Sequence, residues 1–319
     1  MLPRLEPMIV GLGREAFDDN SYIFEPKWDG WRLLIYVGGN ATGNATGTGT
    51  GSSKSRTIEA YTRKGKRVTH QFPELQEALG AIDAAEAVLD AEGICLRDGK
   101  PVFDDLAFRG RLGRQARIEQ ARWTHPATFV VFDILFLDGK SLLQEPLMSR
   151  KRLLAERVSS TQIMTPTMYV ENTGKALFEL TRQQNLEGMV AKRKDGLYIP
   201  GKLSPDWLKF KHWKSIDTVI LGYRTVPRFA LLVGLHFRTV RNKPVSTVEL
   251  GITEEDRRYF AEWAPKHEIH KEGAVQRVEP KLCCRIGYQD RTDTHQLLSA
   301  VFQAFLPDKL PEECMWAYE

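Results

Sequence analysis

The chain has 319 residues, of which 42% are hydrophobic and 27% are charged, a composition typical of a globular protein with about two domains. No apolar run approaches the ~18 residues of a membrane-spanning helix, and the first residues lack an apolar signal core, so we expect a cytoplasmic protein with no membrane partner. The net charge of +4 is too small to establish nucleic-acid binding by itself.

The first predicted feature is a hairpin with a long connection. Residues 38–55 consist almost wholly of Gly, Thr, Asn, Ala and Ser, which predicts a flexible loop. The apolar runs on either side of it, 33–37 and 57–61, are typical of strands. We therefore expect two antiparallel strands joined by this loop.

Strands and helices alternate along the next part of the chain. Residues 87–91 predict a strand, and the continuous apolar run at 128–136 predicts a strand that is buried on both faces. Leu and Phe recur at helical spacing in three segments, which are 73–80, 149–158 and 174–184. This mixture predicts one α+β domain that covers residues 1–214.

The pattern changes after Lys214. Three short strands are expected at 218–223, 231–237 and 245–250, followed by a capping box at 253–256 that begins a helix ending near Trp263. Strands with one interposed helix in a segment of this size are typical of a small β-barrel of the OB-fold kind. We therefore expect residues 215–319 to form an OB-fold domain.

The cysteines and the basic clusters bear on two possible kinds of site, structural zinc and phosphate binding. The cysteines have no metal-ligand spacing, so we expect reduced, buried side chains and no structural zinc; they are Cys95, Cys283, Cys284 and Cys314. Basic residues gather at 63–67, 109–117 and 192–194. Each cluster suits phosphate neutralisation, and each is explained equally well as a solvated charged face.

Lys27 is the candidate nucleophile. It lies two residues before Asp29-Gly30 and five before Arg32. A lysine attacks phosphorus only as the free amine, so neighbouring cations and a divalent metal that lower its pKa would activate it. By itself, the same segment is also compatible with a strand that ends in a solvated Asp-Gly turn.

Two further lysines have the spacing of a strand face. In residues 206–211, alternation places Leu208 and Phe210 on one face and Lys209 and Lys211 on the other. The two ammonium groups could bind phosphate oxygens and lower the pKa of Lys27. An exposed basic face on an edge strand is the simpler alternative.

Two glutamates are candidate metal ligands, and one aromatic is a candidate platform for a base. Glu92 is expected at the end of one strand and Glu187 at the start of another, where carboxylates could share magnesium with the phosphates of ATP. Each is also compatible with a surface position. Phe132 lies in the apolar run 128–136 and could equally be a core residue.

Six blocks in this order resemble the covalent nucleotidyltransferases, which include ATP-dependent DNA ligases, RNA ligases and mRNA capping enzymes. They are KWDGWR (27–32), YTRKG (61–65), DAEG (90–93), FDILFLDG (132–139), EGMVAK (187–192) and WLKFK (207–211). Within this group the chain is most similar to short bacterial DNA ligases of the end-joining and repair type. The resemblance implies an ATP-grasp-like adenylation domain followed by an OB-fold domain.

The resemblance also implies a reaction and its participants. Lys27 would take AMP from ATP with Mg²⁺ or Mn²⁺, and the AMP would pass to the 5′-phosphate of a nick in double-stranded DNA, which an adjoining 3′-hydroxyl then seals. The enzyme would be a nucleoid-associated monomer. A further implication is that Glu25 selects adenine, Phe132 stacks on the base and Arg32 contacts the ribose or the nick.

The remaining implied roles concern metal, phosphate and DNA. Glu92 would hold the ribose or a metal and Glu187 a metal. Phosphate oxygens would be held by three lysines, which are Lys192, Lys209 and Lys211. Arg63, with Lys64 beside it in the same block, would bind the 5′-phosphate of the nick.

One block departs from the family pattern. Related ligases carry an arginine just before Pro-Asp-Lys, and Leu306 occupies that position here. The block is associated with orientation of pyrophosphate, so its change bears on self-adenylylation more than on sealing, although Asp308 and Lys309 remain. Two alternatives stay open: an RNA ligase or capping-type enzyme, and a DNA-end-binding protein with weakened catalysis.

Overall fold

The structure, a computed structural model, describes residues 2–39, 56–292 and 294–316. The chain divides into two compact units, Met1–Lys211 and His212–Glu319. Most of the loop expected at 38–55 lies outside the described residues, beginning at residue 40.

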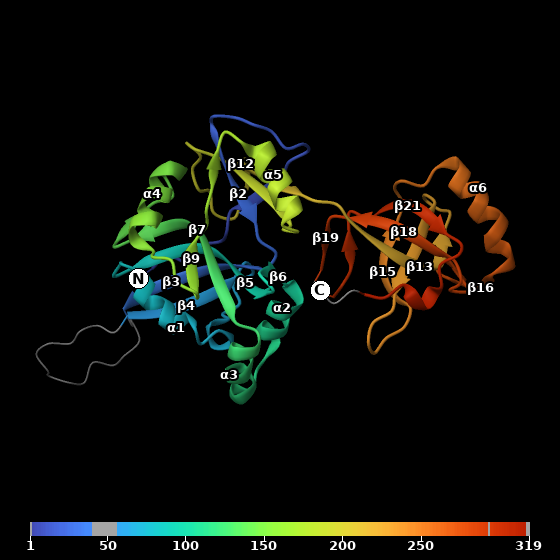
Figure 1. Cartoon of the computed structure of the whole chain (residues 1–319), viewed down its shortest axis with the longest axis horizontal. Coiled ribbons are helices and arrows are strands. Elements are labelled where there is room, and N and C mark those ends of the chain that lie inside the picture. Colours follow the sequence, from blue (N-terminus) through green and yellow to red (C-terminus); the bar gives the residue numbers. More distant parts are fainter. Residues whose placement is uncertain (1, 40–55, 293, 317–319) are drawn as a thin grey trace, which may run out of the picture. The chain divides into compact units, whose positions relative to one another are not determined.

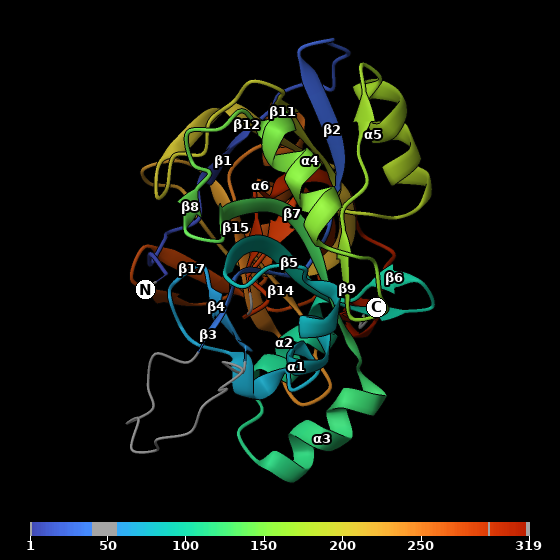
Figure 2. The ribbon, with the colours of Figure 1, turned by 90° about the vertical axis from the view of Figure 1, so that its left-hand side faces the viewer.

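The first unit contains two sheets (Figures 1 and 2). The five-stranded sheet has the order β1 (Ile9–Leu12), β12 (Leu203–Lys211), β11 (Gly188–Arg193), β2 (Tyr22–Lys27) and β10 (Val170–Glu171). The seven-stranded sheet has the order β4 (Arg56–Thr62), β3 (Trp31–Gly39), β5 (Ala87–Arg97), β7 (Ala127–Leu137) and β8 (Lys140–Ser141). In addition, β6 (Lys100–Pro101) pairs with β5, and β9 (Met164–Pro166) pairs with β7.

Both faces of the seven-stranded sheet are buried, which explains its continuous apolar runs. In β3, Leu33 and Ile35 pack into the largest core cluster, which covers one face. Leu34, which points the other way, packs with Ile23 and Trp207 of the five-stranded sheet. The interior between the two sheets therefore receives alternate side chains from both of them.

Helices cover the remaining faces of the first unit. The helix α4 (Leu147–Arg157) contacts β7, and α5 (Gly174–Gln183) contacts β2 and β11 (Figure 1). Both helices confirm the segments expected from helical spacing. The segment expected at 73–80 is a short α1 (Leu75–Ala78) followed by the 3-10 turn η2 (Leu79–Ala81), and η1 (Thr69–Gln71) precedes it.

The structure adds two helices that the periodicity did not predict. They are α2 (Phe103–Arg111) and α3 (Gln115–Thr124), and α3 projects from the end of the unit opposite α5 (Figure 2). Only Ile118 and Ala121 of α3 are buried, so its apolar face is too narrow for recognition by spacing. Within the described residues, no helix is both long enough and apolar enough to cross a membrane.

The second unit is built mainly from short strands. Its main sheet has the order β15 (Lys243–Val248), β14 (Ala230–Leu235), β13 (Lys214–Arg224), β17 (Val275–Val278) and β16 (Glu268–Glu272). The strand β18 (Cys283–Tyr288) pairs with β13 and with β21 (Val301–Leu306). The other elements are α6 (Glu254–Trp263), β19 (Asp290–Arg291), β20 (Leu297–Leu298), and the 3-10 turns η3 (Ala264–Lys266) and η4 (Pro311–Glu313).

The capping box predicted at the start of α6 is present. The Asp256 backbone N–H donates to the Thr253 hydroxyl at 3.1 Å, and the Thr253 N–H donates to the Asp256 carboxylate at 2.8 Å. Phe260 of this helix packs into the core of the unit, together with residues of β13 and β14. The expected strands of this segment are also present, and the four cysteines of the chain are buried and reduced.

Candidate active site

Lys27 is the last residue of β2, and strand alternation decides which way its side chain points. Phe24 packs beneath α5, whereas Ile23 packs on the opposite face against residues of the seven-stranded sheet. Glu25 and Lys27 share the parity of Ile23, so both project toward the seven-stranded sheet.

A short ion pair joins Lys27 to Glu187, which directly precedes β11. The Lys27 Nζ lies 2.5 Å from Glu187 Oε2, and only 21% of the Lys27 side chain is exposed. Burial would lower the pKa of Lys27, but the negative charges of Glu187 and Glu92 outweigh it and raise the pKa above its ordinary value. The expected lowering of the pKa of Lys27 is therefore wrong for the unliganded protein, where the amine is protonated.

Glu187 also binds Lys211, so one carboxylate connects two lysines. The Lys211 Nζ lies 2.5 Å from Glu187 Oε1 because Gly188 of β11 pairs with Lys211 of β12. Burial acts to raise the pKa of Glu187, but Lys27 and Lys211 lower it below its ordinary value. Glu187 is consequently ionised at neutral pH.

The strand β12 has the alternation expected from the sequence. Leu208 and Phe210 pack together beneath α5, and Lys209 and Lys211 take the opposite parity. The strand is not at an edge, because β1 pairs with one side of it and β11 with the other. The alternative of an exposed edge strand is therefore wrong.

Glu92 lies in the middle of β5, which continues to Arg97, and so the expectation that it ends the strand is wrong. It pairs across the sheet with Arg32 of β3. Burial raises the pKa of Glu92 to about 8, and the charge of Glu187 adds to the rise while Lys27 opposes it. Among the described residues, no group of three or more His, Cys, Asp and Glu side chains is arranged to hold a metal ion on its own.

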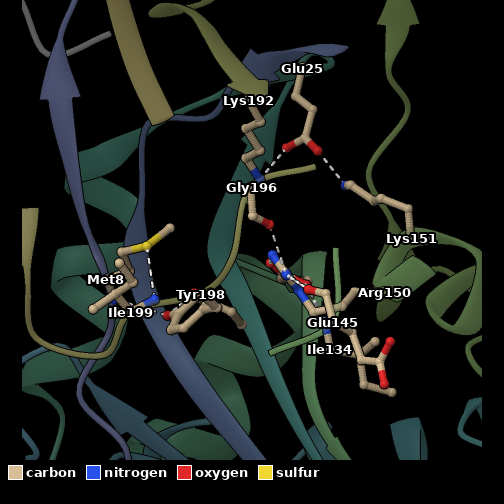
Figure 3. Close-up of polar contacts among 12 residues, drawn as sticks. Met8, Glu25, Ile134, Glu145, Arg150, Lys151, Lys192, Gly196, Tyr198 and Ile199 are labelled. Carbon is tan, nitrogen blue, oxygen red and sulfur yellow. Dashed lines mark hydrogen bonds and ion pairs between the residues drawn. The ribbon is translucent and has the colours of Figure 1, made fainter. Parts of the chain in front are cut away.

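Glu25 is bound by two buried lysines (Figure 3). Lys192 of β11 places its Nζ 2.7 Å from Glu25 Oε2, and Lys151 of α4 contacts Oε1. Burial lowers the pKa of Lys192 to about 8, although the charge of Glu25 opposes the shift. A solvated face is thus excluded for Lys192, which is 2% exposed.

Lys151 was missed by the sequence reasoning, although the sequence contained a signal for it. Leu147, Lys151 and Leu154 lie on one side of α4, because positions i, i+4 and i+7 share a helix face. Leu147 and Leu154 are core residues, so a lysine between them is a buried charge that requires a partner. Helical spacing alone could have indicated this.

Phe132 is half-buried on β7, beside the cations of this site. Its ring centroid lies 4.4 Å from Lys192 Nζ and 5.4 Å from the guanidinium carbon of Arg32. It also makes an edge-on contact with Trp207 at 6.2 Å. The ring therefore lies within the cationic cluster rather than in the main core of the unit.

Arg32 is engaged by protein acceptors in this structure. Its Nε and Nη2 donate to the two carboxylate oxygens of Asp90 at 3.0 and 2.7 Å, and Nη1 donates to the Met8 carbonyl at 2.7 Å. Tyr198 also donates to Asp90, at 2.6 Å. This network links the start of β3 to Asp90 of β5 and fixes the guanidinium beside Phe132.

The basic clusters separate into exposed and buried residues. Arg63 and Lys64 lie exposed in the turn after β4. Arg109, by contrast, is fully buried and donates to Glu74, to the His125 carbonyl and to the Gln71 carbonyl at 2.7–2.9 Å. The expectation that all of cluster 109–117 faces solvent or phosphates is therefore wrong for Arg109.

Asp308 and Lys309 belong to the second unit. Lys309 Nζ lies 3.0 Å from Asp217, which Arg285 also binds at 2.7 Å. Leu306 ends β21 opposite Cys283 of β18, on the same sheet face as Arg285. The last predicted block is therefore held within the second unit by the ion pair between Lys309 and Asp217.

Comparison with known proteins identifies the region that carries the site. Residues 12–211 match the model of the ATP dependent DNA ligase domain. DNA ligase C1 of Mycolicibacterium smegmatis is 29% identical over 98% of this chain and 92% of its own length. The multifunctional non-homologous end joining DNA repair protein LigD of Mycobacterium tuberculosis is 28% identical over 97% of this chain, which spans only 39% of that relative.

A solved structure shows the same similarity. The mycobacterial DNA ligase D complexed with ATP and MES is 26% identical, with a TM-score of 0.53 and coverage of 98% of each chain. The candidate residues predicted from the sequence lie within the matched region, except for Asp308 and Lys309 in the last block.

Proposed function

The chain belongs to the family of ATP-dependent DNA ligase domains, and we propose that it seals nicks with a 5′-phosphate and a 3′-hydroxyl through an AMP adduct on Lys27. The observation that carries this proposal is the position of Lys27. Its amine lies on the inner face of β2, in contact with Glu187 and beside Glu92, and Lys211 binds the same Glu187. This geometry combines a nucleophile with the charges that phosphoryl transfer requires.

The first step is self-adenylylation. The unprotonated amine of Lys27 attacks the α-phosphorus of ATP and forms a P–N bond, while the bond from that phosphorus to the bridging oxygen breaks and pyrophosphate leaves. Lys27 gives up two of its three ammonium protons to water, one before the attack and one as the P–N bond forms, and the adduct keeps a single N–H. Because the ionised Glu187 holds the amine in its protonated form, the step requires the Lys27–Glu187 pair to open.

A divalent cation, Mg²⁺ or Mn²⁺, fits the donors present here. Glu187 is an ionised carboxylate, and the buried Glu92 has a raised pKa that a neighbouring cation would relieve. These two side chains would hold the ion together with phosphate oxygens, and the ion would neutralise developing negative charge.

The nucleotide would lie between side chains on the inner face of the five-stranded sheet and side chains of β3 and β7 in the seven-stranded sheet. Glu25 would accept a hydrogen bond from adenine, with Phe132 as the stacking partner, and Arg32 would lie toward the ribose. Phosphate oxygens would be held by Lys209 and Lys211. Lys192, proposed from the sequence for the same task, pairs with Glu25 here and would lie toward the base.

The second and third steps act on DNA. AMP passes from Lys27 to the 5′-phosphate of the nick, and the 3′-hydroxyl then attacks that phosphorus and expels AMP. The exposed Arg63 and Lys64 would contact the phosphates of the nicked strand. We further propose that the second unit is an OB-fold that carries Asp308 and Lys309, and that a monomer acts on nucleoid DNA in end joining or repair.

The decisive experiment traps the nucleotide on the protein. Wild type is incubated with α-labelled ATP or GTP and a divalent metal, and the denatured protein is examined for label. Label from ATP is expected on wild type and on the exposed control Lys175→Ala, and none on Lys27→Ala. Label from GTP in preference to ATP would instead favour a capping-type enzyme.

Sealing of a 5′-phosphorylated nick completes the test. Wild type is expected to join the nick with ATP, and to join pre-adenylylated nicked DNA without ATP. Binding of the nick without sealing of either substrate would favour the end-binding protein with weakened catalysis.

A further inference from the structure

Lys151 is buried in the proposed nucleotide site, although it lies outside the six sequence blocks that predicted this site. Its side chain is 3% exposed and contacts Glu25 Oε1, while Lys192 binds Oε2 of the same carboxylate. Figure 3 shows the two ammonium groups approaching Glu25 from different elements, α4 and β11. One carboxylate is thereby held at both of its oxygens.

The two lysines are positioned by different means. Lys192 is fixed by its strand, since β11 pairs with β2 in continuous register, and its ammonium also lies 3.9 Å from the Trp207 ring centroid. Lys151 is fixed by its helix, because Arg150 beside it donates to both oxygens of Asp133 at 2.8 and 2.9 Å. The orientation of Glu25 therefore depends on the docking of α4 as well as on the sheet.

This arrangement leaves the Glu25 carboxylate able to accept further hydrogen bonds. A carboxylate has about four acceptor directions, and each of the two ammonium groups forms an ion pair with one of its oxygens. A carboxylate that pairs with two ammonium groups offers hydrogen-bond acceptors and no donor. Such a group accepts from the 6-amino group of adenine and repels the 6-carbonyl oxygen of guanine.

We infer that Lys151 is a positioning residue that orients Glu25 toward the 6-amino group of the purine and thereby sets nucleotide selectivity. The inference rests on the proposed function, in which Glu25 contacts the base. Without Lys151, the Glu25 carboxylate is free to turn both oxygens toward Lys192. The acceptor directed at the base is then lost, although the charge remains.

The test compares two nucleotides that differ only in the group Glu25 recognises. Self-adenylylation is measured with ATP and with purine riboside 5′-triphosphate, which lacks the 6-amino group. Wild type is expected to favour ATP in kcat/KM by about 10- to 100-fold, as for other substrates that lose one hydrogen bond to a buried partner. In Lys151→Met the ratio is expected to fall toward one, mainly through a higher KM for ATP.

Three further variants separate positioning from a general structural role. Arg152→Ala, at the next and exposed position of α4, is the matched control and is expected to keep the wild-type ratio. Lys151→Arg keeps the charge and is expected to restore most of the ratio, which also covers the case in which Lys151→Met does not fold. Glu25→Gln/Lys151→Met is expected to lose no more selectivity than Glu25→Gln.

An equal loss with both nucleotides in Lys151→Met, or wild-type selectivity in a folded Lys151→Met, would overturn the inference. Loss of selectivity in Lys151→Arg as complete as in Glu25→Gln would also overturn it. Unchanged selectivity in Glu25→Gln would instead reject the role proposed for Glu25, and absence of any adduct on wild type would reject the proposed function itself.

Discussion

The ammonium nitrogen of Lys27 lies 2.5 Å from a carboxylate oxygen of Glu187, although the two residues are 160 positions apart in the sequence. Pairing of β2 with β11, in which Lys27 is opposite Gly188, brings them together. In the unliganded protein the pair keeps the amine of Lys27, the proposed nucleophile, in its protonated and unreactive form. Activation of Lys27 is therefore coupled to removal or neutralisation of the Glu187 charge.

The first prediction concerns the pKa of Lys27 in the unliganded protein. Because the negative charge of Glu187 raises this pKa, Glu187→Gln is expected to lower the midpoint of Lys27 reactivity by about one pH unit or more. Competitive labelling with acetic anhydride, followed by peptide mass spectrometry across a pH series, measures it. The exposed Lys64 is the internal control, and an unchanged Lys27 midpoint in the variant would contradict the ion pair.

The second prediction concerns Glu92 and stability. Its pKa is raised to about 8, so between the ordinary value of 4.5 and about 8 the folded protein holds a proton that the unfolded chain has lost. Wild-type stability should therefore fall relative to Glu92→Gln as the pH rises through this window, by at most ~1.4 kcal/mol per pH unit. Urea unfolding at pH 5 to 8.5 tests the sign, and a constant difference would reject it.

The third prediction concerns the buried pair Arg150–Asp133, in which neither side chain is exposed to solvent. Arg150→Met is expected to cost about 3–5 kcal/mol of unfolding free energy, because it leaves Asp133 charged and unpaired in the interior. Asp133→Asn/Arg150→Met should recover part of this loss. Urea unfolding measures both, and the exposed Arg152→Ala, expected within about 0.5 kcal/mol of wild type, is the control.

The fourth prediction separates the buried and exposed members of cluster 109–117. Arg109→Met is expected to lose about 3–5 kcal/mol of stability, since it leaves Glu74 unpaired in the interior, and to keep the salt dependence of binding to nicked DNA. The exposed Arg117→Ala should keep its stability and lower the slope of log affinity against log salt by about one. A slope change in a folded Arg109→Met would disagree with its burial.

The fifth prediction tests the capping box of α6. Thr253→Ala removes the hydroxyl that accepts from Asp256 and is expected to cost about 1 kcal/mol, whereas Thr253→Ser retains the acceptor and should be near neutral. Amide hydrogen exchange of the first turn of α6 in the full chain is the measurement. Equal protection in both variants would show that the cap contributes little.

Much of the secondary structure could be predicted because it depends on local patterns. The run Leu33–Val37 and the run 128–136 are strands, and the spacing around Leu177 gives a helix. The capping box at Thr253 uses residues only three positions apart, so it could be read directly. By contrast, α3 has too few apolar residues to show a periodic face, and the length of β5 beyond Glu92 depends on its partners β3 and β7.

The sequence by itself determined which residue types are available for the chemistry and which strand face each one takes. Alternation places Lys209 with Lys211, and Lys27 with Glu25. The sequence did not determine the protonation state of these groups. The expectation that the pKa of Lys27 is lowered was wrong, because its carboxylate neighbours raise it.

Only the tertiary structure decided the charge partners. Lys27 meets Glu187 because β2 and β11 are neighbours in register, and Glu25 meets Lys151 because α4 docks beside the sheet. Such contacts depend on strand order, register and helix packing, which no periodicity within one segment specifies. A pKa depends on burial and on charges a few ångströms away, so it follows from these long-range contacts rather than from the local sequence.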